Sequence, residues 1–170
     1  MLYLSDELAV RIRTHAAESY PHECCGAVLG SDSGSWREVL DLFPLVNRRD
    51  DSPRNRFVIT PEDFRAAEQT ARKGGLEVIG WYHSHPDHPA RPSEYDREHA
   101  WPWYSYVIAS VMQHLPKDMK SWRLKDDRTE FDEEEMEITP FGTINGGRVN
   151  AGEGDHPDRA SALRGQARKR

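Results

Sequence analysis

The stretch LEVIGWYHSHPDHPARPSEYD, residues 76–96, decides how the rest of the chain is interpreted. Its first part is a short apolar run, which is typical of a buried strand, and it ends in His83-x-His85. The following prolines make the next segment a stiff, non-helical loop. Ser93 then opens a helix and places Asp96 in its first turn. The stretch therefore predicts a strand, a loop and a helix start, with polar side chains gathered where the strand ends.

His83 and His85 have the spacing of two metal ligands. Positions i and i+2 of a strand point to the same face, so the two imidazoles converge on one point. A catalytic zinc site needs a third protein ligand and keeps one position open for water. The candidates for the third ligand are Asp87, His88, Asp96 and His99. Read from its left end the stretch has the pattern of a two-metal hydrolase, whereas read whole it pairs His83-x-His85 with Ser93-x-x-Asp96.

Length, charge and cysteine content narrow the class of protein. A chain of 170 residues is one ordinary domain with room for a hydrophobic core. A net charge of -6 argues against a nucleic-acid-binding surface. We expect no membrane span and a cytoplasmic protein, because there is no leader-like segment and no apolar run near the ~20 residues of a span. Cys24 and Cys25 are too close together to form a disulfide framework.

The end of the chain differs in composition from the rest. Residues 145–170 are rich in glycine, carry more Lys and Arg than Asp and Glu, and have few large apolar side chains. Such a segment cannot bury enough surface to offset its ordering entropy. We therefore predict a folded domain over residues 1–144 and a disordered basic tail over residues 145–170.

Periodicity and punctuation predict a mixed α/β (α+β) fold in which helices sandwich a β-sheet. Ser5 and Thr60 are expected N-caps, and Pro61 and a Gly74-Gly75 stop bound the second helix. The expected helices begin at residues 5, 60 and 93, and the expected strands cover 24–30, 37–47, 76–85 and 104–112. The first two strands are expected to pair as a hairpin. Residues 120–127 and 130–138 are predicted as edge strands.

A family resemblance joins the stretch to an earlier motif. PHECCG, residues 21–26, is followed by His83-x-His85-Pro86, and seven residues separate His85 from Ser93-x-x-Asp96. Together these motifs resemble the signature of the JAMM (MPN-plus) zinc metalloproteases, and most closely their stand-alone prokaryotic members. The resemblance covers roughly residues 5–125 and includes RFVITPEDF (56–64) and GWYHSHP (80–86).

The resemblance implies both a fold and a function. The fold would be that of the MPN and cytidine-deaminase-like proteins. His83, His85 and Asp96 would bind one zinc ion, Glu23 would act as general acid and base, and Ser93 would help to stabilise the oxyanion. The implied reaction is hydrolysis of an amide or isopeptide bond after the C-terminal glycine of a ubiquitin-like or sulfur-carrier protein. The resemblance identifies neither the particular partner nor the oligomeric state, and it does not separate isopeptide cleavage from release of a free amino acid.

Two other functions remain as alternatives. A two-metal hydrolase resembling the metallo-β-lactamase superfamily would use His83, His85, Asp87 and His88 as ligands, but it needs further ligands downstream, where few histidines follow. A metal-free scaffold of the same fold would usually have lost ligand residues, and this chain retains them all.

Several single residues also have a purely structural interpretation. Ser93 and Asp96 could form only a helix cap, and Glu23 could be a surface carboxylate. Cys24 and Cys25 are expected to be small buried hydrophobic residues rather than nucleophiles. A local basic cluster, formed by Arg48, Arg49, Arg54 and Arg56, could contact an acidic small protein or could be a solvated loop.

Overall fold

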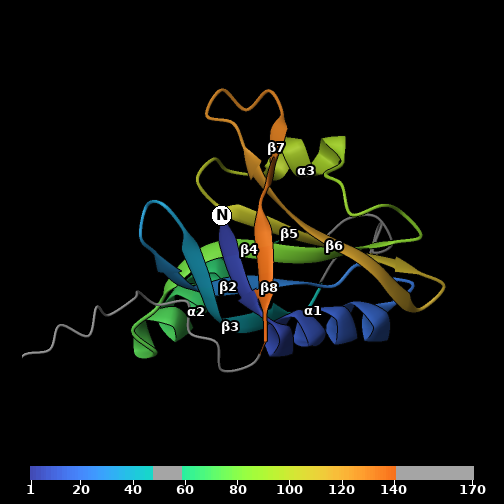
Figure 1. The fold of residues 1–170 in the computed structure, drawn as a ribbon, viewed down its shortest axis with the longest axis horizontal. Coiled ribbons are helices and arrows are strands. Elements are labelled where there is room, and N and C mark those ends of the chain that lie inside the picture. The colour runs from blue at the N-terminus through green and yellow to red at the C-terminus, as the bar shows by residue number, and fades with distance from the viewer. Residues whose placement is uncertain (48–58, 141–170) are drawn as a thin grey trace, which may run out of the picture.

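The computed structural model describes residues 1–47 and 59–140, which form eight strands and three helices. The strands are β1 (Leu2–Ser5), β2 (Cys25–Asp32), β3 (Arg37–Leu45), β4 (Glu77–Pro86), β5 (Ser105–Met112), β6 (Leu115–Leu124), β7 (Phe131–Glu134) and β8 (Met136–Thr139). The helices are α1 (Asp6–Ser19), α2 (Pro61–Lys73) and α3 (Glu94–His99). All strands belong to one mixed sheet in the order β7-β6-β5-β4-β2-β3-β1-β8 (Figure 1).

The sheet is strongly curled. β7 and β8 lie at opposite ends of the strand order, although only Glu135 separates them along the chain. The two edges must therefore come together at this residue, where the backbone N–H of Leu2 donates to the Glu135 carbonyl at 2.8 Å. Figure 1 shows β7 and β8, both orange, following one another past the N-terminus.

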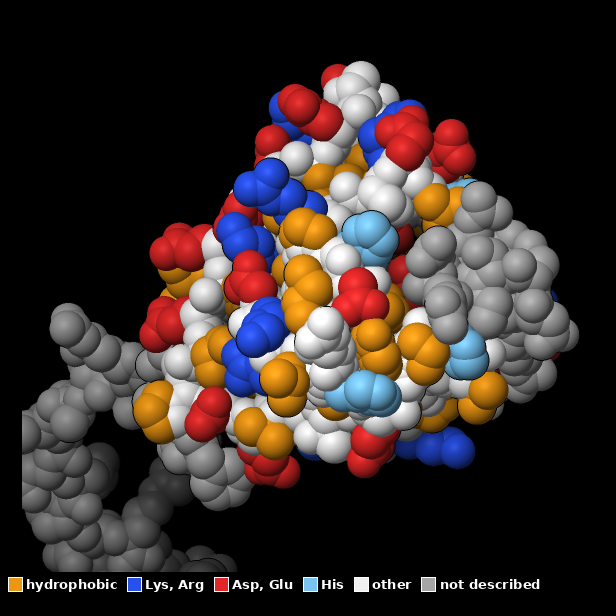
Figure 2. Space-filling model, turned by 90° about the vertical axis from the view of Figure 1, so that its right-hand side faces the viewer, with side chains coloured by type: hydrophobic (Ala, Val, Ile, Leu, Met, Phe, Trp, Pro, Cys, Tyr) orange, Lys and Arg blue, Asp and Glu red, His pale blue; other side chains and the backbone are white. Residues whose placement is uncertain are grey.

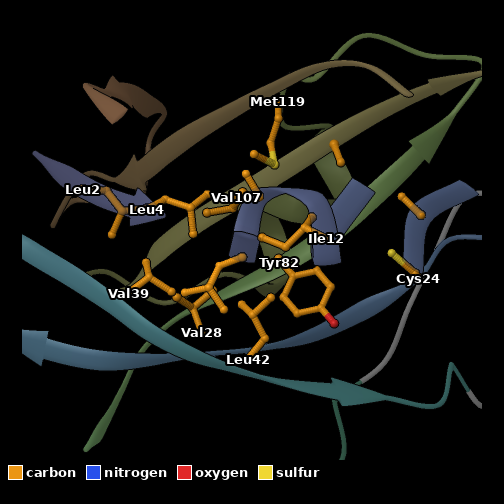
Figure 3. Close-up of a cluster of buried hydrophobic side chains, with 14 of the residues drawn as sticks. Leu2, Leu4, Ile12, Cys24, Val28, Val39, Leu42, Tyr82, Val107 and Met119 are labelled. Carbon is orange, nitrogen blue, oxygen red and sulfur yellow. The ribbon is translucent and has the colours of Figure 1, made fainter. Parts of the chain in front are cut away.

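Helices cover both faces of the sheet, as the expected fold class requires. The apolar side of α1, with Leu8 and Ile12, packs into a core cluster with Leu2, Val107 and Tyr82 (Figure 3). On the other face, Ala67 and Ala71 of α2 belong to a second cluster with Cys25 and Trp81. The central strand β4 contributes to both clusters, so it is buried on its two faces.

The helix boundaries follow the expected capping signals. The Ser5 side chain accepts a hydrogen bond from the Leu8 N–H, which fixes the start of α1. At α2, Thr60 and Asp63 form a reciprocal capping box, with Pro61 at the first helical position. Gly74 ends α2 and donates its N–H to the last turn. These caps place α2 across the face of β4 that carries the candidate ligands.

Three strand predictions need correction. β1 was not expected, because a strand of four residues leaves little periodic signal, yet it pairs in parallel with both β3 and β8. β6 begins at Leu115 rather than 120 and lies inside the sheet, not at its edge. Pro116 and the polar residues beside it resemble a loop, but a bulge at Lys117 accommodates them in the strand. Residues 130–138 form two edge strands instead of one.

Some predictions concern residues that the structure does not describe. The basic tail at 145–170 and the arginine cluster at 48–56 both lie outside the described ranges.

No described helix is long and apolar enough to cross a membrane. Figure 2 shows a face on which basic, acidic and histidine side chains are interspersed with hydrophobic ones.

Close packing between β4 and β5 predicts the effect of one substitution. A Cβ atom at Gly80 would lie 2.2 Å from the Ser105 carbonyl oxygen, which belongs to the paired backbone and cannot move aside. We expect Gly80→Ala to lower the free energy of unfolding by about 1–3 kcal/mol, the usual cost of overpacking. Gly74→Ala is the matched control, because its Cβ would meet only ordinary contacts at 3.5 Å or more. Equal denaturant midpoints for the two variants would contradict this prediction.

Candidate metal centre

A bulge in β4 sets which side chains face α2. Val28 of β2 pairs with Gly80 and Leu29 pairs with Val78, so Ile79 is an extra residue in β4. Beyond the bulge the alternation is regular, with Trp81 in the α2 cluster and Tyr82 in the α1 cluster. His83 and His85 continue the face of Trp81. The expected convergence of the two imidazoles is confirmed, since their Nε2 atoms lie 3.1 Å apart.

The first turn of α3 brings Asp96 to these histidines. Ser93 is the N-cap, and its Oγ accepts a hydrogen bond from the Asp96 N–H at 3.1 Å. In return, Asp96 Oδ2 accepts from the Ser93 N–H at 2.6 Å and from the Ser93 hydroxyl at 2.7 Å. Ser93 and Asp96 therefore do form the expected helix cap. It does not compete with the ligand interpretation, because the same capping box holds the carboxylate in place.

The three side chains form a compact group of metal donors. Asp96 Oδ1 lies 3.3 Å from His83 Nε2, and Asp96 Oδ2 lies 3.4 Å from His85 Nε2. All three residues are buried, and their potential ligand atoms lie within 4.8 Å of one another. His85 Nδ1 is 3.1 Å from the Pro89 carbonyl oxygen, an acceptor that requires the proton on Nδ1. That tautomer leaves the lone pair of Nε2 directed at the group, as in established metal sites.

The electrostatics of the group suit a cation. Burial lowers the pKa of His83, which favours the neutral imidazole that a metal needs. Burial alone would raise the pKa of Asp96, but in the metal-free protein a protonated His83 beside it, with hydrogen bonds from the two histidine rings and the Ser93 backbone N–H, lowers that pKa well below its usual range. A bound metal ion would take the place of the protons on the two Nε2 atoms. A carboxylate and two imidazoles are the ligand forms that bind a divalent metal ion. His83, His85 and Asp96 are thus able to hold a metal.

Glu23 is a buried carboxyl group beside this group of donors. The pairing of β2 with β4 places Cys25 opposite His83, and the Ser84 N–H donates to the Cys24 carbonyl at 3.1 Å. Continued by one more residue, this register brings Glu23 to the level of His85. Glu23 is only 5% exposed, so the surface-carboxylate interpretation is wrong. Burial, and then the negative charge of Asp96, raise the pKa of Glu23 to about 9.

A largely aromatic cavity of about 300 Å³ adjoins the donors. His83 and Asp96 line one part of its wall, so a group bound in the cavity lies beside the metal centre. The rest of the wall comes from the start of α2, from α3 and the segment between α3 and β5, and from strands β4 and β5. It includes Phe64, Trp81, Tyr95, Trp101, Tyr104 and Tyr106. Sequence reasoning missed this cavity, because each aromatic residue taken alone is typical of a core.

The structure separates the remaining ligand candidates from the centre. Asp87 and His88 are exposed, and the Asp87 carboxylate accepts hydrogen bonds from the Tyr20 hydroxyl and the Gln113 N–H. The exposed His99 contacts the Tyr95 carbonyl through Nδ1. Among the described residues, the possible metal-binding group is that of His83, His85 and Asp96 alone. This arrangement argues against the two-metal interpretation.

The adjacent cysteines are structural. Cys24 and Cys25 are free thiols with 2% and 0% exposure, and Cys24 points into the α1 core cluster (Figure 3). Burial raises the pKa of both thiols to about 12, so neither forms the thiolate that a nucleophile requires.

Comparison with known proteins identifies the family. The family of prokaryotic homologues of the JAB domain matches residues 5–125, which is most of the chain. The chain belongs to this family. The membership confirms the JAMM/MPN-plus resemblance and, with the mixed sheet between helices, the expected fold.

Two named relatives and one solved structure are similar to this chain. The desampylase of Haloferax volcanii is 37% identical over 106 residues, which are 62% of this chain and 74% of that protein. A probable TtuB-protein conjugate cleaving protease of Thermus thermophilus is 32% identical over 108 residues, 64% of this chain and 69% of that protein. The solution structure of DSY2949 from Desulfitobacterium hafniense, 35% identical, superposes with a TM-score of 0.72 over 82% of this chain and 94% of its own.

The raised pKa of Glu23 predicts a pH-dependent cost to stability. Between the ordinary pKa of 4.5 and about 9, the folded metal-free protein keeps a proton on Glu23 that the unfolded chain releases. Stability from this group is therefore complete below pH 4.5 and is lost as pH rises towards 9. We expect metal-free Glu23→Gln to melt above wild type at pH 8, by about 2–4 °C for each 1 kcal/mol gained. The difference in melting temperature between the two proteins should be smaller at pH 5. An equal difference at pH 5 and at pH 8 would contradict the expectation.

Proposed function

We propose that this protein is a zinc-dependent hydrolase that cleaves an amide or isopeptide bond after the C-terminal glycine of a ubiquitin-like or sulfur-carrier protein. One observation carries the proposal. Three buried donor side chains, from His83, His85 and Asp96, converge beside the buried Glu23 carboxyl group. Membership of the JAB family supports the same conclusion.

The donor set fits zinc. Two imidazole nitrogens and one carboxylate oxygen are the ligands of a catalytic zinc site, which leaves one position for water or substrate. When bound, a zinc ion lowers the pKa of its water from that of bulk water towards roughly 7 and polarises a carbonyl group. The Pro89 carbonyl and the Ser93 capping box hold His85 and Asp96 in the orientation that such a site needs.

Glu23 is the proposed proton carrier. A divalent cation beside it would favour its ionised form and so offset the burial that raises its pKa. As a carboxylate it accepts a proton from the attacking water, whose oxygen bonds to the substrate carbonyl carbon. It then donates this proton to the leaving nitrogen as the C–N bond breaks, since an amide anion is too basic to leave. Glu23 therefore both takes up and returns the proton.

Ser93 has two possible contributions. Its hydroxyl donates to Asp96 Oδ2 in the metal-free protein, which orients a ligand. We propose that with metal and substrate bound the hydroxyl turns its one proton from Asp96 to the developing oxyanion, where one donor is worth a factor of about 10²–10³ in kcat. The Ser93 N–H still donates to Asp96 Oδ2.

The substrate class rests on the family and on the cavity. The two relatives above are named for cleaving sampylated or TtuB-linked protein conjugates. An extended glycine-ended tail carries little bulk next to the scissile bond and can pass a buried metal centre. The aromatic cavity beside His83 and Asp96 then accommodates an apolar side chain further along the tail.

The central test separates proton transfer from metal binding. We expect Glu23→Gln to retain one zinc per chain and substrate affinity but to lose turnover by about 10²–10⁴-fold, the usual contribution of a general acid and base. Asp96→Ala should lose the zinc itself. Substrates should be glycine-ended ubiquitin-like conjugates, with products read by mass spectrometry so that isopeptide cleavage and amino-acid release are distinguished.

Three results would count against the proposal. A Glu23→Gln protein as active as wild type would remove Glu23 from the mechanism. Two zinc ions per chain, with His88→Ala losing metal and Asp96→Ala keeping it, would favour the two-metal alternative. A wild-type protein that binds glycine-ended conjugates but cleaves none of them would favour the scaffold alternative.

Ser93→Ala distinguishes the two contributions of the hydroxyl. Loss of the orienting hydrogen bond should weaken zinc binding by about 10–100-fold, the usual effect of removing an outer-shell partner. Loss of oxyanion stabilisation should lower kcat at saturating zinc, but less than Glu23→Gln does. Zinc titration followed by kinetics at saturating metal measures both effects, and an unchanged kcat there would exclude the oxyanion role.

A further inference from the structure

The base and the ligands lie on two strands whose regular pairing stops at the site. The β2–β4 ladder ends with Cys25 opposite His83. Past that pair, Ser84 makes one more contact on each side, its N–H donating to the Cys24 carbonyl and its Oγ accepting from the Cys24 N–H at 2.9 Å. Glu23 is the next residue out, so sheet hydrogen bonds alone do not fix its distance from His85.

A side-chain contact closes the gap beyond the site. The Tyr20 hydroxyl donates to Asp87 Oδ2 at 2.8 Å. Tyr20 stands three positions before Glu23 and Asp87 two positions after His85, so this bond links the segment of the base to the segment of the ligand. Along the two segments, the Tyr20–Asp87 bond lies on one side of Glu23 and His85, and the Cys24–Ser84 contact lies on the other side. Glu23 and His85 thus lie between two hydrogen-bonded links that join their segments.

Asp87 is itself firmly anchored. Its N–H donates to the Val111 carbonyl at 2.7 Å, and its Oδ1 accepts from the Gln113 N–H at 3.0 Å. Its φ of 58° lies in the left-handed region, which Asp tolerates better than most residues. The Tyr20 ring packs against the His114 ring, with centroids 4.2 Å apart. The β5–β6 turn therefore holds both partners of the Tyr20–Asp87 bond.

We infer that Tyr20 and Asp87 are a positioning pair that sets the place of Glu23 relative to His85. The inference rests on the proposed function, because it assigns the pair to the proton carrier of that reaction. Both carboxylate oxygens of Asp87 are used, one for the base segment and one for the β5–β6 turn. Asp87 thus has a role in the site although it is not a ligand.

The expected size of the effect follows from the geometry that proton transfer needs. A general base must lie within hydrogen-bonding reach of the proton that it takes, and a misplacement of about 1 Å can cost as much as 10²-fold in rate. Tyr20→Phe removes the hydrogen bond to Asp87 and keeps the ring. We expect it to lower kcat by roughly 10-fold while KM and zinc affinity stay unchanged. Asp87→Gly removes the same bond without straining the left-handed backbone and should lower kcat at least as far.

A conservative variant provides the rescue. In Asp87→Asn the amide oxygen can still accept from the Gln113 N–H, and the amide NH₂ can donate to the Tyr20 oxygen. This variant should keep most of the wild-type kcat. Controls are Tyr3→Phe, whose ring packs on Trp36 away from the site, and Asp127→Ala, an exposed aspartate that caps a turn at Thr129. Neither control should change kcat.

Combining variants tests whether the pair acts through Glu23. The double variant Tyr20→Phe with Asp87→Gly should be no slower than the slower single variant, because both substitutions break the same hydrogen bond. In a Glu23→Gln background, Tyr20→Phe should leave the residual single-turnover rate unchanged. Melting temperature and zinc content of every variant exclude a loss of fold or metal.

The possible outcomes separate this inference from the proposed function. An inactive Glu23→Gln together with a fully active Tyr20→Phe overturns the positioning pair and leaves the proposed function in place. A fall in zinc affinity in Tyr20→Phe that parallels its loss of rate also overturns it, since the bond would then act on His85. A fully active Glu23→Gln overturns both.

Discussion

The antiparallel pairing of β2 with β4 is the constraint on which the site depends. It places Cys25 opposite His83 and so brings a carboxyl group from the start of one strand to two imidazoles at the end of another. The bulge at Ile79 adjusts the phase of β4, so that the imidazoles face α2 and not the α1 core. With any other register, Glu23 and the ligands would lie on opposite faces or at different levels of the sheet.

The second constraint is the cap of α3. A carboxylate in a capping box is ordinarily a device for starting a helix. Here Asp96 satisfies the Ser93 N–H and hydroxyl with Oδ2 and directs Oδ1 at His83. The residue that caps the helix start is therefore also the one that we propose as a metal ligand. The cost of burying its carboxylate is offset by the same hydrogen bonds that shape the helix.

Sequence patterns predicted the parts of the site that depend on local geometry. The two-residue period of a strand directed His83 and His85 to one face, and the spacing of Ser93 and Asp96 identified a helix N-terminus. The burial of Glu23 depends on pairing between distant strands, which the residues around it do not encode. Proximity in sequence made Asp87 a ligand candidate, yet its left-handed backbone turns its carboxylate towards Tyr20 and Gln113. Likewise, β6 was misplaced because a bulge allows a proline inside a strand.

The central position of β4 has a consequence for recognition. β5 occupies one hydrogen-bonding edge along the whole part that carries the histidines. β2 occupies the other edge as far as His83, beyond which the Cys24–Ser84 and Tyr20–Asp87 contacts join the two segments. An incoming chain therefore cannot join the sheet as a neighbour of the ligand strand. It must be held by side chains and by loop backbone around the rim. The proposed catalytic groups are thus supported by the interior of the sheet, and the choice of substrate falls to its periphery.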